Sequence, residues 1–342
     1  RALLLGLVAF ALLRTASLVF SPLELGVDEA QYWLWSTGFD FGYYTKPPLT
    51  SWIIGLSHGL FGHHEWAVRL PAPWLHLATS LVLWRAADWL AGPAAGWIAA
   101  IIWMTLPSIA LGSFVISTDT PLLLCWSAGV LALVGVLTGR LRERRGMLLA
   151  GGAFGAAMLA KYAAIYGLAG LALFVLATSV LSRGKDRQKV IGWRGLGLFT
   201  LGMVVVASPN ILWNLANELT TVRHLGDNAN LDLRSYSLAG SIGFLAAQFA
   251  TAGPVVFALM FGILRTRRGD DAGLLLLCLS APVILVIMVQ AFLSEANANW
   301  GLAAMPALVL WLARWMAQAR PVIGRLATVS YTHLTLPTIV SV

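Results

Sequence analysis

Residues 119–138 read DTPLLLCWSAGVLALVGVLT and are followed by Gly139 and Arg140. The 18 residues 121–138 carry no charged side chain, and about 20 apolar residues suffice for a helix to cross the hydrocarbon core of a bilayer. The Ser/Thr/Asp residues and Pro121 at the beginning of the run are typical of a helix start. The stretch therefore predicts a membrane-spanning helix with an acid at one end and arginine at the other.

Similar runs recur along the chain. The 342 residues are 58% hydrophobic and only 11% charged, whereas ordinary soluble domains are about 25% charged. This composition excludes an ordinary soluble domain and predicts an all-α polytopic membrane protein with about ten transmembrane helices. The predicted spans are 2–20, 67–88, 94–112, 121–138, 147–160, 162–181, 193–213, 239–264, 273–293 and 301–318.

The stretch 21–66 lies between the first two spans and is rich in Trp, Tyr and Pro. Aromatic rings with polar groups favour the headgroup zone of a bilayer. The composition of 21–66 therefore predicts interfacial helices that lie along the membrane.

The charges assign the two faces. One set of alternating loops contains sixteen Lys/Arg and five Asp/Glu, a balance of +11, and the opposite set has a balance of −5. Together with Arg1 and Arg14 these loops give the formal net charge of +8. The positive-inside rule makes the basic set cytoplasmic. The net positive charge thus indicates topology, and nucleic acid is not an expected partner.

The domain organisation is expected to be a single transmembrane unit, residues 1–328. It contains a first outer loop, 21–66, and a second large outer loop, 214–238. The tail 329–342 resembles the translation of a sequencing adaptor, so we expect it to be non-native and exclude it from the fold. Cys125 and Cys278 both lie in apolar runs and predict neither a disulfide framework nor a zinc site.

Two acidic clusters are predicted on the outer side. Asp28 and Glu29 come just after the first span, and Asp119 begins the span quoted above. Acids at these places can simply stabilise helix N-termini. A carboxylate at the lipid boundary can also accept a proton from an attacking hydroxyl, or bind a metal.

Two lysines are predicted at the same boundary. Lys46 lies in the rigid segment Tyr43-Tyr44-Thr45-Lys46-Pro47-Pro48, and Lys161-Tyr162 lies at the tip of a tight helical pair. Each ammonium could extend to lipid headgroups. Each could equally bind the phosphate of a lipid-linked substrate.

Amides and aromatic residues, which suit sugar hydroxyls, occupy the remaining outer loops, although long polar loops are also ordinary. The candidate sugar- or acceptor-binding residues are Tyr43, Tyr44, Asn214, His224, Asp227, Asn228 and Asn299.

Taken together and in order, these motifs resemble the membrane-embedded GT-C glycosyltransferases. They are most similar to the bacterial branch of the superfamily of protein mannosyltransferases and lipid A aminoarabinose transferases. The resemblance rests on Asp28-Glu29, Tyr43-Tyr-x-Lys46-Pro-Pro-Leu49, Val68-Arg69-Leu-Pro71, Ser117-Thr-Asp119-Thr-Pro121 and Leu159-Ala-Lys161-Tyr162.

The resemblance implies an inverting transfer of a sugar from a polyprenyl-phosphate donor to an envelope acceptor. The reaction would take place on the periplasmic face of a bacterial inner membrane. It implies that Asp28 is the base, with Glu29 and Asp119 orienting it or shaping the acidic cavity. Lys46 and Lys161, with Arg69 and Tyr162, would hold the carrier phosphate. The sugar and the acceptor, whether lipid A, another glycan, a lipid or a protein, stay open.

One position departs from the family pattern. Aminoarabinose transferases have an acidic metal ligand directly before the lysine of the Lys-Pro-Pro motif, and this chain has Thr45 there. The use of a divalent metal is therefore left open, and the metal ligands are unknown.

A transporter or flippase of lipid-linked sugars is the main alternative. Transporters place polar residues near the middle of their helices, whereas Arg14 is the one clear charge in mid-span here. A polysaccharide polymerase or ligase is a second alternative, but such proteins have outer loops rich in Arg and His. The pattern favours an enzyme at the outer boundary.

Overall fold

The computed structural model describes residues 2–181, 191–229, 236–264 and 270–318, and these residues form helices and loops without a β-strand. The helices are α1 (Ala2–Val19), α2 (Val27–Ser36), α3 (Leu49–Phe61), α4 (Glu65–Arg69), α5 (Pro71–Ala91), α6 (Pro93–Thr105), α7 (Pro107–Gly112), α8 (Asp119–Leu137), α9 (Glu143–Ala160), η1 (Tyr162–Ala164), α10 (Ile165–Leu181), α11 (Trp193–Ala216), α12 (Thr220–Ala229), α13 (Leu238–Ala252), α14 (Pro254–Leu264), α15 (Asp271–Leu293), η2 (Ala298–Ala304) and α16 (Met305–Gln318). The predicted tail 329–342 lies outside the described residues.

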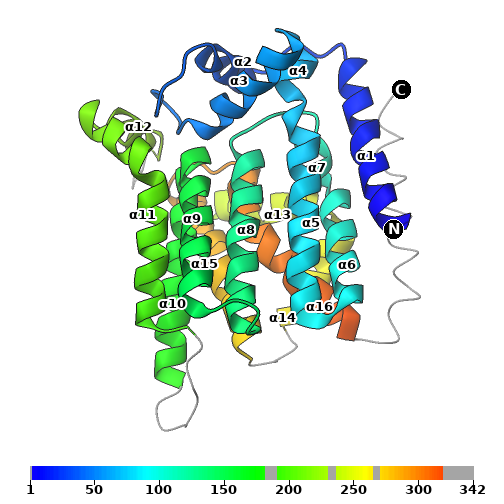
Figure 1. Cartoon of the computed structure of the whole chain (residues 1–342), viewed down its shortest axis with the longest axis vertical. Helices are drawn as coiled ribbons and strands as arrows, with labels where there is room; N and C mark the ends of the chain where they lie inside the picture. Colours follow the sequence, from blue (N-terminus) through cyan, green and yellow to red (C-terminus); the bar gives the residue numbers. More distant parts are fainter. Residues whose placement is uncertain (1, 182–190, 230–235, 265–269, 319–342) are drawn as a thin grey trace.

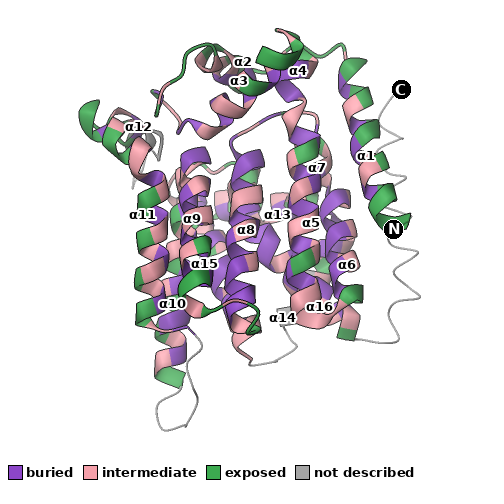
Figure 2. Cartoon of the chain, viewed as in Figure 1, coloured by how far each residue is buried: buried purple, intermediate pink, exposed green. Residues whose placement is uncertain are grey.

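The long helices run side by side as a bundle, and α2, α3, α4 and α12 lie together at one end of it (Figure 1). The turn between α8 and α9, with its arginines, lies at the opposite end. This separation agrees with the acidic and basic faces expected from the loop charges. Helix α8 is central, with 72% of its apolar window buried, while α1 flanks the bundle with 22% buried (Figure 2).

Six of the described helical segments are long and apolar enough to cross a membrane. They are Ala2–Val19, Asp119–Leu137, Tyr162–Leu181, Trp193–Ala216, Asp271–Leu293 and Ala298–Gln318. Three shorter apolar helices, Leu49–Phe61, Pro93–Thr105 and Leu238–Ala252, accompany them. Within the described residues, length and composition therefore support six of the ten predicted spans.

Not every predicted span is a single helix. The span 94–112 divides into α6 and α7 at Pro107, and the span 239–264 divides into α13 and α14 at Pro254. Proline lacks the backbone N–H and its ring clashes with the preceding turn, and Gly253 before Pro254 has a φ of 79°. These two prolines end the preceding helix, so the prediction of unbroken spans there was wrong.

Glycines allow the closest helix crossing. A Cβ added at Gly151 or Gly155 of α9 would lie 2.0 Å from the Phe199 carbonyl oxygen or 2.6 Å from that of Met203, both on α11. Small residues four apart let helix backbones approach in a membrane, where dispersion rather than the hydrophobic effect drives packing. The α9–α11 pair is thereby fixed, and it carries Lys161 at one end.

Arg14 ties α1 to the bundle. Its side chain is buried and donates to the Ser113 hydroxyl (2.9 Å) and to the Met104 carbonyl oxygen (2.7 Å). The guanidinium also lies 4.3 Å from the centre of the Phe10 ring. A buried charge is tolerated when it is hydrogen-bonded, so this mid-span arginine has a structural explanation.

Candidate active site

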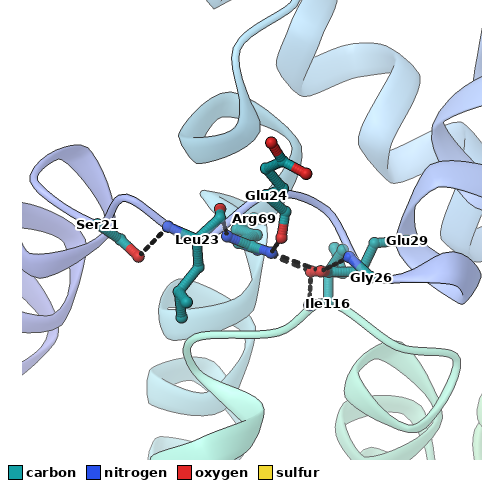
Figure 3. Close-up of polar contacts among 7 residues, drawn as sticks. All are labelled: Ser21, Leu23, Glu24, Gly26, Glu29, Arg69 and Ile116. Carbon is teal, nitrogen blue, oxygen red and sulfur yellow. Dashed lines mark hydrogen bonds and ion pairs between the residues drawn. The ribbon is translucent and has the colours of Figure 1, made fainter.

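A buried ion pair joins α2 to α4 at the acidic end of the bundle. The Arg69 guanidinium donates to both Glu29 carboxylate oxygens, from Nε to Oε1 at 2.9 Å and from Nη2 to Oε2 at 2.7 Å (Figure 3). Arg69 also donates to the Leu23 and Glu24 carbonyl oxygens, at 2.8 and 2.7 Å. Both side chains are almost completely buried, 5% and 2% exposed.

The acceptor positions of the Glu29 carboxylate are occupied by four hydrogen bonds from described residues. Besides the two bonds from Arg69, its carboxylate accepts the backbone N–H of Ile116 at 3.0 Å and that of Gly26 at 3.0 Å. A carboxylate offers about four acceptor positions. Glu29 therefore connects the start of α2, α4 and the segment that leads to α8.

A second ion pair lies at the same end and is more open. The Lys161 ammonium is 2.7 Å from Oδ1 of Asp119, and Asn299 Nδ2 donates to Oδ2 at 2.8 Å. Asp119 begins α8, Lys161 follows α9, and Asn299 belongs to η2. The Asp119 side chain is 7% exposed, but that of Lys161 is 22% exposed, so the lysine keeps a solvent-facing side.

Asp28 lies near this second pair and is exposed, unlike its neighbour Glu29. The buried side chain of Tyr32 lies close to Asp28 and Thr118. Burial, followed by the charges of Asp28 and Asp119, raises the pKa of Tyr32. A neutral Tyr32 hydroxyl therefore lies near both carboxylates.

Lys46 completes the group of charges. Its ammonium has no ion-pair or hydrogen-bond partner within the described part of the chain. Burial lowers the pKa of Lys46, the carboxylates of Asp28 and Asp119 raise it, and Lys161 lowers it. These influences place Asp28, Lys46, Asp119 and Lys161 in one electrostatic cluster, which we call the outer charge cluster.

The loop that carries Lys46 is held by α11 and α12. Asn210 Nδ2 donates to the Phe41 carbonyl oxygen at 2.7 Å, and the Thr221 hydroxyl donates to that of Tyr43 at 2.6 Å. A Cβ added at Gly42 would lie 2.3 Å from the Trp213 ring, so the loop backbone lies directly on that ring.

Tyr162 and Asn214 support the same attachment. The Tyr162 hydroxyl donates to Asn210 Oδ1 at 2.8 Å and accepts from Asn214 Nδ2 at 2.9 Å. The Asn214 side chain is buried, and its Oδ1 has no hydrogen-bond partner among the described residues. The predicted phosphate ligand Tyr162 and sugar ligand Asn214 are thus parts of a network behind the Lys46 loop.

The two tyrosines before Lys46 differ. Tyr43 is buried, stacks on Trp35 with ring centres 5.0 Å apart, and donates to the Gly38 carbonyl oxygen at 2.9 Å. Tyr44 is 61% exposed and its ring centre lies 5.0 Å from that of His224. The side chains of Asp227 and Asn228 lie outside the described residues. Of these predicted ligands, Tyr44 and His224 form an accessible aromatic pair beside the Lys46 loop.

Comparison with known proteins shows a likeness to membrane glycosyltransferases. The model of the family described as dolichyl-phosphate-mannose-protein mannosyltransferase matches residues 45–213, which include Lys46, Asp119 and Lys161. The chain is similar to this family over that stretch. It is also 38% identical, over 320 residues, to the lipid A galacturonosyltransferase RgtD of Rhizobium johnstonii. That match covers 90% of this chain and 65% of RgtD.

Solved structures establish the family's fold. ArnT of Cupriavidus metallidurans, crystallised with undecaprenyl phosphate, superposes with a TM-score of 0.69 at 20% identity, over 99% of this chain and 65% of ArnT. The oligosaccharyltransferase AglB of Archaeoglobus fulgidus gives 0.59 at 14% identity, over 99% of this chain and 54% of AglB. The protein is therefore a multi-pass membrane protein with the GT-C fold of ArnT, and it spans 65% of the length of RgtD and of ArnT.

Within this family fold, the residues around Thr45 do not suit a divalent metal. The Thr45 hydroxyl donates to Gln31 Oε1 at 3.3 Å, a contact between two neutral side chains. Hard divalent cations prefer carboxylate oxygens, and the described residues contain no group of three or more His, Cys, Asp or Glu arranged to bind a metal.

The sequence prediction missed Tyr32, Asn210 and Thr221. Tyr32 follows Asp28 by four residues, and residues four apart share a helix face, so this spacing could have identified it. Asn210 and Thr221 contact a loop about 170 residues earlier, and no local pattern signals such contacts.

Proposed function

We propose that this protein transfers a sugar from a polyprenyl-phosphate donor to lipid A on the outer face of a bacterial inner membrane. The observation that carries the proposal is the outer charge cluster at one end of the bundle, in which an exposed carboxylate lies near a lysine that has no ion pair with any described residue. A lipid-linked donor keeps its tail in the bilayer and its phosphate at the surface. The cluster supplies cations for that phosphate and an acid for the chemistry.

In the proposed step, the acceptor hydroxyl oxygen attacks the anomeric carbon as the bond between that carbon and the phosphate oxygen breaks. The hydroxyl proton passes to Asp28, which acts as general base. The departing phosphate keeps the bonding electrons, and Lys46 and Lys161 stabilise its growing charge. Attack from the side opposite the phosphate inverts the anomeric carbon.

The contacts divide the candidate residues into two groups. Asp28 and Lys46 have side chains available to ligands, whereas Asp119 holds Lys161 through a short ion pair. Glu29 and Arg69 bind each other, and we therefore propose a structural role for them in place of base and phosphate ligand. Tyr43, Tyr162 and Asn214 position the Lys46 loop, and Tyr44 and His224 remain the candidates for the sugar or acceptor.

The similarity to RgtD narrows the substrate class. RgtD is a lipid A galacturonosyltransferase. The match to it, at 38% identity, covers 90% of this chain and 65% of RgtD. We therefore propose a uronic acid as the transferred sugar and lipid A as the acceptor, with undecaprenyl phosphate or a similar polyprenyl phosphate as the carrier.

The proposal includes the full topology. The four predicted spans that fall outside the six candidates correspond to α5, to α6 with α7, to α9 and to α13 with α14. We propose that they also cross the bilayer in the bundle, which gives ten crossings. Helices α2 and α3 then lie along the outer surface, where Val27 (90% exposed) and Leu60 (70% exposed) meet lipid.

The test uses purified protein in liposomes with a polyprenyl-phosphate galacturonic acid whose sugar is radiolabelled, and lipid A as acceptor. We expect label to appear in lipid A. Label that crosses the bilayer on intact donor, without transfer, would show the alternative flippase activity. Transfer from polyprenyl-phosphate aminoarabinose but not from polyprenyl-phosphate galacturonic acid would support glycosyltransferase activity and overturn the sugar assignment.

A further inference from the structure

A basic groove lies at the end of the bundle opposite the outer charge cluster. It is formed by the turn between α8 and α9 and by the first turns of α9, and its volume is about 650 Å³. Its lining residues are Arg140, Leu141, Arg142, Arg144, Arg145, Leu148 and Leu149. Figure 2 shows this turn as exposed.

Two other arginines at the same end are paired with acids. Arg85 pairs with Asp88 at 3.2 Å, and Arg314 pairs with Asp270. By contrast, the four groove arginines are all exposed and have no ion pair within the described ranges of the chain. Four cations with few counter-charges form a strong site for an anion.

The nearby acid does not neutralise the groove. Glu143 lies in the same turn but does not line the cavity. Its Oε1 would be 2.9 Å from a Cβ added at Gly195, so its carboxylate lies against the start of α11. The groove therefore keeps a net positive charge.

The groove also has an apolar side. Leu148 and Leu149 line it on α9, and Leu149 is 50% exposed. Leu141 packs inward, 2.8 Å from a Cβ added at Gly135 of α8. The groove thus has cations at its rim and leucines along α9, where this helix enters the apolar bundle. This combination matches a ligand with a phosphate and a hydrocarbon chain.

We propose that this groove binds an anionic glycerophospholipid of the leaflet on the basic face. The phosphate lies between the guanidinium groups, which bind phosphate oxygens in a bidentate way. An acyl chain lies along Leu148 and Leu149. Basic pockets between membrane helices on the cytoplasmic side are suited to such headgroups. The positive-inside rule explains why arginines lie on this face, but it does not require them to form a groove or to lie beside leucines. The proposal does not depend on glycosyl transfer.

The experiment measures lipid binding to purified protein in detergent, by native mass spectrometry and by the thermal midpoint. The probes are phosphatidylglycerol, cardiolipin, phosphatidylcholine and inorganic phosphate. We expect the two anionic lipids to remain bound and to raise the thermal midpoint by a few degrees, and phosphatidylcholine and phosphate to have little effect. A full shift with inorganic phosphate would overturn the lipid assignment.

Two pairs of variants locate the site. Arg144→Gln with Arg145→Gln should weaken binding of phosphatidylglycerol about tenfold, a loss of about 1.4 kcal/mol. The Lys counterparts at both positions should retain most of it, which also controls for folding. Arg314→Gln removes a charge that is paired with Asp270, outside the groove lining on the same face, and should leave binding unchanged. Equal loss in Arg314→Gln and in the groove Gln pair would show diffuse attraction and overturn the groove.

Discussion

Two ion pairs lie at the same end of the bundle, and they differ in what surrounds them. Arg69 and Glu29 are both at most 5% exposed, and every strong acceptor position of the carboxylate is filled. Lys161 is 22% exposed and has one carboxylate partner, with Lys46 and Asp28 close by. The first pair joins three segments of the chain, and the second leaves charges that a ligand can reach.

The comparison teaches that acid and base content alone does not locate the chemistry. Asp28 and Glu29 are adjacent in sequence, yet Glu29 turns into the protein and Asp28 turns to the surface. Removal of one partner from a buried pair leaves an uncompensated charge and destabilises the fold. Removal of an exposed catalytic group affects the rate instead. The variants below separate these two outcomes.

The largest effect is expected for Asp28→Asn. A general base contributes about 10²–10⁴ to the rate, so kcat for transfer should fall about a thousandfold while the thermal midpoint stays near that of the wild type. Glu24→Gln, at another exposed acid nearby, should keep its rate. Transfer at the wild-type rate in Asp28→Asn would refute the base assignment.

Glu29→Gln should show the opposite pattern. The buried Arg69 would lose its charged partner, at a cost of about 3–5 kcal/mol in the free energy of unfolding. The yield of folded protein and the thermal midpoint should therefore drop, whereas kcat per folded molecule changes little. Glu65→Gln in α4, where the acid is exposed, is the control. A stable variant with a low kcat would instead assign Glu29 to the chemistry.

Lys46→Met should raise KM for the lipid-linked donor about tenfold to a hundredfold. Burial lowers the pKa of Lys46, so its charge disfavours the folded state at pH values below that pKa. Methionine removes this cost, and the thermal midpoint should be equal to or above that of the wild type. A large fall in the midpoint would show that Lys46 is structural.

The same pKa direction predicts a pH dependence. As the pH rises toward the lowered pKa, the ammonium loses its proton, and donor KM should rise at a lower pH than for an ordinary lysine. Lys46→Arg keeps its charge and should move this alkaline limb upward. A limb that stays in place in Lys46→Arg would assign the titration to another group.

The smallest effect is expected from metal removal. Thr45 and Gln31 form a contact between two neutral side chains, so a chelator should leave the transfer rate within about twofold of the untreated enzyme. Loss of activity on chelation, with recovery on addition of one divalent ion, would show a metal site that these residues do not suggest.

Much of this arrangement follows from the sequence, and the exceptions have physical causes. Loop charges predicted which end carries Asp28, Lys46, Asp119 and Lys161, because the positive-inside rule acts on each loop independently. The breaks at Pro107 and Pro254 were not predicted, but they could have been, because proline sterically disrupts the helix before it. The partner of each charged side chain could not be predicted, because it depends on how the helices rotate and pack against one another.

The missed contacts show the same limit. Sequence patterns placed Glu29 and Arg69 near the site, but did not reveal that two residues 40 positions apart pair with each other. Asn214 and Tyr162 look like ligands by residue type, and only their contacts show them behind the Lys46 loop. Which distant residues pair depends on how the side chains of the core fit together, and residue composition alone does not determine this fit.

The attachment of the Lys46 loop has a consequence for how the protein is made. The carbonyl oxygen of Phe41 binds a side chain 169 residues later, and Asp119 binds one 180 residues later. A chain inserted into the membrane from its N-terminus therefore presents Lys46 and Asp119 long before their partners leave the ribosome. The outer charge cluster and the Lys46 loop therefore reach their final arrangement only after α11 and η2 have been synthesised.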